Sequence, residues 1–65
     1  MNNLEGRVIV ITGGSGGIGI VASELMGARG AHVVLAELDG DRADIEAKRL
    51  SNKGLRATAI QTDVA

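Results

Sequence analysis

Three short segments rich in apolar residues are separated by two segments of helical periodicity. Residues 8–11 form a continuous β-branched run closed by turn-forming residues, which predicts a buried β-strand, and residues 32–38 and 57–62 are expected to form a second and a short third strand. The first intervening segment has apolar residues at i, i+3, i+4, i+7 and i+8, a spacing typical of a helix that lays one face on a sheet: Ile18, Val21, Ala22, Leu25 and Met26. Gly30 is expected to end this helix.

The second helical segment is expected from about Arg42 to Lys53, just before Gly54. It follows a turn at residues 39–41, Asp-Gly-Asp, in which a carboxylate oxygen can cap the start of the helix. Its apolar stripe is thinner than that of the first helix, with only Ala43, Ala47 and Leu50. We therefore expect this second helix to be the more exposed of the two.

The order strand, helix, strand, helix, strand predicts an α/β fold with three parallel strands. Right-handed crossovers place the strands in the order 3-2-1 with both helices on one face, which is half of a dinucleotide-binding fold within a single domain, residues 1–65. In the complete fold the first strand is central and the other face is covered. Here residues 8–11 are expected to form an open apolar edge beside a bare sheet, which predicts self-association or a homo-oligomer.

Composition narrows the classes of protein further. A chain of 65 residues without cysteine and with a single histidine has neither a disulfide nor a metal cluster to stabilise it, so association or further sequence is expected to do so. The net charge of -1 comes from scattered charges, which argues against nucleic acid and anionic membrane as partners. No leader pattern and no apolar run of roughly 20 residues is present, so a cytoplasmic location is expected.

A glycine-rich loop separates the first strand from the first helix. Residues 12–19 read Thr-Gly-Gly-Ser-Gly-Gly-Ile-Gly and hold five of the ten glycines. Backbone N–H groups at a helix start lack partners within the helix and bind a diphosphate well, and glycine lets the backbone approach the oxygens. The loop satisfies three glycine patterns at once, so spacing alone does not choose among them: G-x-x-x-G-x-G on Gly13, Gly17 and Gly19; G-x-x-G-x-x-G on Gly13, Gly16 and Gly19; and G-x-G-x-x-G on Gly14, Gly16 and Gly19.

An acidic residue lies at the end of the second strand, at the position where an adenosine ribose is expected. The spacing between the last glycine of the loop and Glu37 is close to the roughly 20 residues typical of dinucleotide-binding folds. A carboxylate at that spacing accepts hydrogen bonds from the ribose hydroxyls. A 2′-phosphate there would meet a like charge, so NAD is expected over NADP. Arg42 is the nearby cation that keeps NADP as a lesser alternative.

The chain resembles the N-terminal third of the short-chain dehydrogenase/reductase family, as distinct from its extended, epimerase-like relatives. The resemblance rests on Leu-Glu-Gly-Arg at residues 4–7, Thr-Gly-x-x-x-Gly-x-Gly at residues 12–19 and Asp-Val at residues 63–64. It implies a structural role for Thr12, and contacts of Asp63 and Val64 with the adenine. The cofactor-binding set expected from the loop, the strand end and the resemblance is Gly13, Ser15, Gly16, Gly17, Ile18, Gly19, Glu37, Leu38, Asp63 and Val64.

The resemblance also implies catalytic Ser, Tyr and Lys residues, and this chain contains no tyrosine. Ser23, Ser51, Lys48 and Lys53 are assigned no catalytic role. One hypothesis is therefore the NAD-binding part of an enzyme that transfers hydride between NAD(H) and an alcohol or carbonyl. The alternatives are a stand-alone nucleotide-binding or self-associating half-domain without catalysis, and a flavin-binding segment, since Gly14, Gly16, Gly19 and Glu37 also fit the flavin fingerprint.

Overall fold

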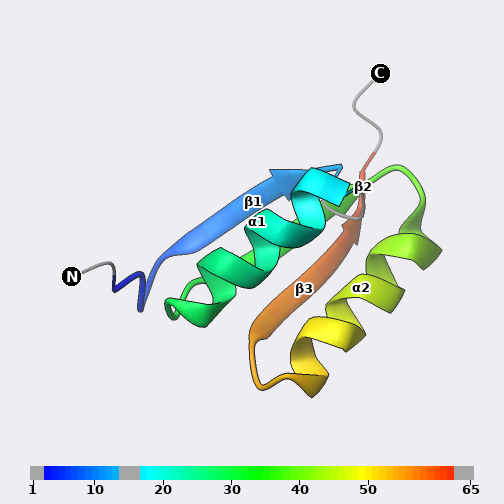
Figure 1. Cartoon of the computed structure of the whole chain (residues 1–65). Coiled ribbons are helices and arrows are strands. Elements are labelled where there is room, and N and C mark those ends of the chain that lie inside the picture. Colours follow the sequence, from blue (N-terminus) through cyan, green and yellow to red (C-terminus); the bar gives the residue numbers. More distant parts are fainter. Residues whose placement is uncertain (1–2, 14–16, 63–65) are drawn as a thin grey trace.

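The computed structural model describes residues 3–13 and 17–62, which form a three-stranded sheet and two helices (Figure 1). The elements occur in the predicted order: β1 (Val8–Thr12), α1 (Gly17–Ala28), β2 (His32–Glu37), α2 (Gly40–Asn52) and β3 (Arg56–Gln61). The boundaries differ from the predicted ones by one or two residues. Leu38, predicted to end the second strand, lies just beyond β2.

All three strands are parallel, and β2 lies between β1 and β3. The order β1-β2-β3 is the predicted 3-2-1 when read from the opposite edge. The register aligns Val8 with His32 and Arg56 at one end, and Thr12 with Ala36 and Ile60 at the other. Because the strands are in step, their carboxyl ends meet at one edge of the sheet, where open α/β sheets bind ligands.

Both helices cover the same face of the sheet, as expected from right-handed crossovers (Figure 1). Val33 and Leu35 of β2 point into the layer between sheet and helices, where they form the core with Ala47 and Leu50 of α2. The alternation of burial along each strand follows from the two-residue period of a β-strand.

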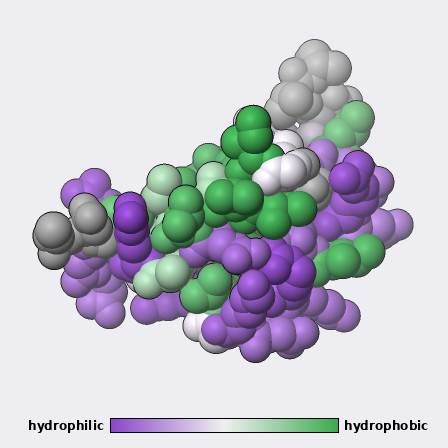
Figure 2. Space-filling view, in the orientation of Figure 1, coloured by the Kyte–Doolittle hydropathy of each residue, from purple (hydrophilic) through white to green (hydrophobic). Residues whose placement is uncertain are grey.

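The prediction that α2 is the more exposed helix does not hold for the apolar stripes of the two helices. In α1, the apolar residues Ile18, Val21 and Leu25 are exposed, whereas Ser23 and Gly27 are buried. In α2, the thin apolar stripe packs into the core, since Ala43 and Leu50 are buried completely. Figure 2 shows the result: apolar side chains gather over α1, and the surface of α2 is mostly hydrophilic.

The residues predicted to end the first helix and to cap the second have the expected roles. Gly30 ends the turn after α1 with a φ of 99°, a backbone conformation that favours glycine. Asp39 caps α2, since its Oδ1 accepts hydrogen bonds from the backbone N–H groups of Asp41 at 3.1 Å and Arg42 at 3.2 Å. This cap starts the helix at Gly40, before the predicted Arg42.

The opposite face of the sheet is not covered by any described part of the chain. Val8 and Val10 of β1 are 65% and 61% exposed, and Ile60 of β3 is 48% exposed. His32 and Thr58 make the amino end of this face more polar, since His32 Nε2 and Thr58 Oγ1 lie 2.7 Å apart in a hydrogen bond. The bare apolar face expected from the sequence is therefore present.

Candidate functional site

The predicted site residues that the structure describes gather at the carboxyl edge of the sheet. The backbone N–H of Gly13, just past β1, donates to the carbonyl of Ala36 in β2 at 2.9 Å. The backbone N–H of Thr62, just past β3, donates to the carbonyl of Glu37 at 2.8 Å. These two bonds align the ends of the three strands, so the start of the glycine loop and the end of β2 are neighbours.

Gly13 makes the turn out of β1 in a conformation that favours glycine. Its φ is 64°, in the left-handed region, and no atom of the described residues lies within 4 Å of where a Cβ would lie. The need for glycine here is thus conformational, which agrees with the role that the loop pattern predicts for its first glycine.

The start of α1 presents an open surface suited to an anion. Among the described residues, a Cβ added to Gly17 would meet no atom within 4 Å, and the Ile18 side chain is 89% exposed. The first turn of α1 contains no acidic residue, in contrast to α2, which begins with Asp39 as its cap and Asp41 in its first turn. The first N–H groups of a helix lack partners within it, and the helix dipole favours negative charge there.

Small residues hold α1 close to the rest of the fold, a feature that sequence reasoning missed. Ser23 is buried completely, and its hydroxyl donates to the carbonyl of Gly19 at 2.7 Å. A Cβ on Gly27 would lie 3.1 Å from Cδ1 of Leu55, so the helix approaches closely at that point. The available signal was the four-residue spacing of Gly19, Ser23 and Gly27, which places small residues on one face of the helix.

The second half of the site is the turn between β2 and α2. Glu37 is the last residue of β2 and is half-buried, and Leu38, next to it, is 64% exposed. Glu37, Asp39 and Asp41 make this turn acidic, with Arg42 as the first base that follows. The described residues enclose no pocket.

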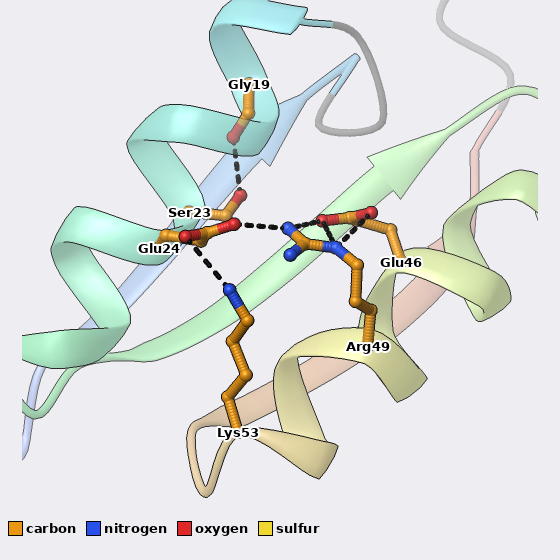
Figure 3. A network of polar contacts seen from close by, with 6 residues as sticks. All are labelled: Gly19, Ser23, Glu24, Glu46, Arg49 and Lys53. Atoms are coloured by element: carbon orange, nitrogen blue, oxygen red, sulfur yellow. Dashed lines mark hydrogen bonds and ion pairs between the residues drawn. The ribbon is translucent and has the colours of Figure 1, made fainter.

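A network of charged side chains fastens α1 to α2 (Figure 3). Arg49 of α2 lies between Glu24 of α1, at 2.6 Å, and the buried Glu46 of its own helix, to which its Nε donates at 2.9 and 3.0 Å. Lys53 Nζ also pairs with Glu24, at 3.3 Å. The hydrogen bonds to Glu46 and Glu24 raise the pKa of Arg49 above its ordinary value, and those from Arg49 and Lys53 lower the pKa of Glu24.

This network predicts a pH-dependent contribution to stability. Glu24 has a lowered pKa in the folded protein, so its contribution is present above the ordinary value of 4.5 and is lost as the pH falls through the lowered pKa. The unfolding midpoint of a Glu24→Gln variant is expected to lie slightly below that of wild type at neutral pH, with the gap closing below pH 4.5. Thermal unfolding across pH measures this, with Asp44→Asn, an exposed carboxyl of α2 outside the network, as control. A gap that stays constant with pH would contradict the ionic role of Glu24.

Four predicted cofactor contacts, Ser15, Gly16, Asp63 and Val64, lie outside the described residues, as does Gly14 of the flavin-type pattern. Of the described predicted contacts, Gly13 lies just past β1 and is bonded to Ala36 of β2, while Gly17, Ile18 and Gly19 begin α1, and Glu37 and Leu38 lie at the end of β2. Neither α1 nor α2, the helices of the described part, is long and apolar enough to cross a membrane.

Parallel βαβαβ topology, a glycine turn after β1 and a helix start open to an anion define a Rossmann-type dinucleotide-binding segment. The sequence profile described as short chain dehydrogenase matches residues 7–65. The chain therefore belongs to the short-chain dehydrogenase family, a family of oxidoreductases that bind nicotinamide dinucleotides.

Individual relatives agree with this assignment. An uncharacterized oxidoreductase of Thermotoga maritima is 42% identical over 62 residues, which is 95% of this chain and 24% of that protein. A putative D-mannonate oxidoreductase from Haemophilus influenza with bound NAD superposes with a TM-score of 0.90 at 32% identity, covering 95% of this chain and 22% of the other. The RhlG/NADP active-site complex of Pseudomonas aeruginosa gives 0.87 at 34% identity, covering 94% and 24%. The chain thus spans about a quarter of the length of these relatives.

Proposed function

We propose that this chain is the NAD-binding part of an oxidoreductase that transfers hydride between NAD(H) and an alcohol or carbonyl substrate. The observation that carries the proposal is that the open start of α1 and the acidic end of β2 lie at one edge of one parallel sheet. A helix start suits the diphosphate of a dinucleotide, and a carboxylate suits the hydroxyls of its adenosine ribose.

In the proposed complex the diphosphate lies on the backbone N–H groups at the start of α1, over Gly17, Ile18 and Gly19. Glu37 accepts hydrogen bonds from the adenosine ribose, with Leu38 beside it. Ser15 and Gly16 complete the diphosphate side, and Asp63 and Val64 contact the adenine, as the family resemblance implies.

The charges of the β2–α2 turn favour NAD over NADP. A 2′-phosphate beside Glu37 would meet a like charge, and such a contact near 4 Å costs about 4 kcal/mol per unit charge at an effective dielectric of 20. Asp39 already accepts from the N–H groups of Asp41 and Arg42 that could otherwise bind the phosphate. One solved neighbour carries NAD and another NADP, so this proposal rests on the residues of the chain itself.

The chemical step requires residues that these 65 do not supply. In the family that this chain resembles, Tyr acts as acid or base, Lys lowers its pKa and Ser orients the carbonyl, but no tyrosine is present here. We propose that the catalytic groups come from sequence beyond residue 65. A reading frame that continues with Asn-Ala-Gly and Tyr-x-x-x-Lys would support this, and a stop codon after Ala65 would contradict it.

Calorimetric titration of the full-length gene product with NAD, NADP and FAD tests the choice of cofactor. Saturable binding of NAD, at least tenfold tighter than that of NADP, is the expected result. Tighter binding of FAD would instead favour the flavin alternative, and binding of none of the three would contradict the proposal.

The uncovered sheet face favours a second candidate, a half-domain that associates with copies of itself. Val8 and Val10 of β1 and Ile60 of β3 expose apolar surface on this face, and β1 is an edge strand of the sheet that the described residues form. Exposed apolar faces and strand edges promote association. We expect the isolated 65-residue chain to be self-associated or only partly folded. Sedimentation velocity measures this, and a compact monomer that unfolds cooperatively would contradict the expectation.

A further inference from the structure

The side chain of Gln61 joins the end of β3 to the turn that carries Glu37. We propose that Gln61 is a positioning residue: it fixes the β2–α2 turn and thereby sets how strictly Glu37 discriminates between an adenosine ribose with a free 2′-hydroxyl and one with a 2′-phosphate. This inference rests on the proposed function and deepens it, because it assigns part of the cofactor selectivity to a residue that does not touch the cofactor.

Two consecutive carbonyls of the turn are held from β3. Gln61 lies opposite Glu37 in the register of the sheet. The backbone N–H of Thr62 donates to the Glu37 carbonyl at 2.8 Å, and Nε2 of Gln61 donates to the Leu38 carbonyl at 3.1 Å. The second bond extends the β2–β3 pairing by one residue into the turn, beyond the last backbone pair.

The same side chain packs against the first residue of α2. A Cβ added to Gly40 would lie 3.2 Å from Cβ of Gln61 and 3.3 Å from its Cδ and Oε1. Since these distances are shorter than ordinary contacts, glycine at position 40 leaves the room that Gln61 needs to reach the Leu38 carbonyl. Sequence reasoning gave Gly40 only a turn role and gave Gln61 none.

Three consecutive residues of the turn are therefore held, two of them by Gln61. Leu38 is held by Gln61, Asp39 by the hydrogen bonds of its carboxylate to the start of α2, and Gly40 by its packing against Gln61. A turn held in this way keeps the carboxylate of Glu37 at one distance from the ribose. Because the repulsion between like charges falls with distance, a looser turn would accommodate a 2′-phosphate more easily and would hold the ribose hydroxyls less well.

The test compares the dissociation constants of NAD and NADP for variants of the full-length gene product. Gln61→Met keeps the length of the side chain but removes its donor, and Gly40→Ala displaces Gln61 from the other side. A single hydrogen bond of this kind corresponds to roughly a 2- to 13-fold change in binding. We expect either variant to weaken NAD binding by about fivefold, with NADP binding unchanged or tighter, so that the ratio of the two constants falls.

Thr58→Val is the matched control. Thr58 also hydrogen-bonds from β3 to β2, through His32, but at the opposite end of the strands. It is expected to lower the unfolding midpoint while leaving the NAD to NADP ratio unchanged. If Thr58→Val changes the NAD to NADP ratio as much as Gln61→Met does, the role of Gln61 is purely structural and the inference is overturned.

A double-mutant cycle with Glu37→Gln shows whether Gln61 acts through Glu37. The double variant is expected to have the same NAD to NADP ratio as Glu37→Gln alone, because Gln61 then has no charge to position. Additive effects of the two substitutions would contradict the inference. If Glu37→Gln abolishes the preference for NAD but Gln61→Met leaves it intact, the inference about Gln61 is overturned and the proposed function stands. A ratio that does not respond to Glu37→Gln contradicts the proposed role of Glu37 itself.

Discussion

A Gly17→Val variant is expected to fold as wild type does and to bind NAD about 100-fold or more weakly. Among the described residues, no atom lies within 4 Å of a Cβ built at position 17, so the added side chain is expected to leave the fold intact. It would instead occupy the space over the start of α1 where the diphosphate is proposed to lie. Hydrogen bonds to a charged group contribute roughly 1.5–3 kcal/mol each, so the loss of two of them corresponds to 100-fold or more in affinity.

Isothermal titration with NAD and thermal unfolding, both on the full-length gene product, measure the two halves of this expectation. Ala28→Val is the control, because it places the same β-branched residue at the exposed opposite end of the same helix. Its affinity for NAD is expected to equal that of wild type. A Gly17→Val protein that binds NAD normally would show that the start of α1 does not hold the diphosphate.

Replacing Glu37 by Ser and Leu38 by Arg is expected to shift the preference from NAD toward NADP by about 100-fold. The first change removes the like charge that a 2′-phosphate would meet, and the second supplies a cation beside it. Leu38 is 64% exposed, so an Arg side chain has room there, and the backbone carbonyl that Gln61 binds is retained. The measured quantity is the ratio of kcat/KM for the two cofactors, or of their dissociation constants.

Leu38→Arg alone separates the two contributions. It is expected to improve NADP binding modestly while the carboxylate still opposes the phosphate. Selectivity that stays at the wild-type value in the double variant would remove Glu37 from the ribose site.

The strands and the helix boundaries could be predicted because local chemistry determines them. The run of β-branched residues at 8–11 has no competing pattern, and Asp39 caps α2 through an interaction within three residues of itself. Gly30 likewise ends its turn because the backbone there has positive φ. Parallel order followed from two crossover connections of ordinary length.

The packing of the helices could not be predicted in the same way. Periodicity identifies which residues of α1 are apolar, but the burial of Gly27 depends on how closely the helix approaches Leu55, at a distant position in the sequence. The contact of Gln61 with Leu38 is of the same kind, since it joins two elements through the register of the sheet. Such features depend on tertiary geometry, and no pattern within one element predicts them.

The most direct test of the central claim is a crystal structure of the full-length gene product with NAD. The diphosphate oxygens are expected within hydrogen-bond distance of the backbone N–H groups at the start of α1, with the adenosine ribose hydroxyls at the carboxylate of Glu37. A dinucleotide bound away from residues 13–19 would contradict the claim that this helix start and this strand end form the cofactor site.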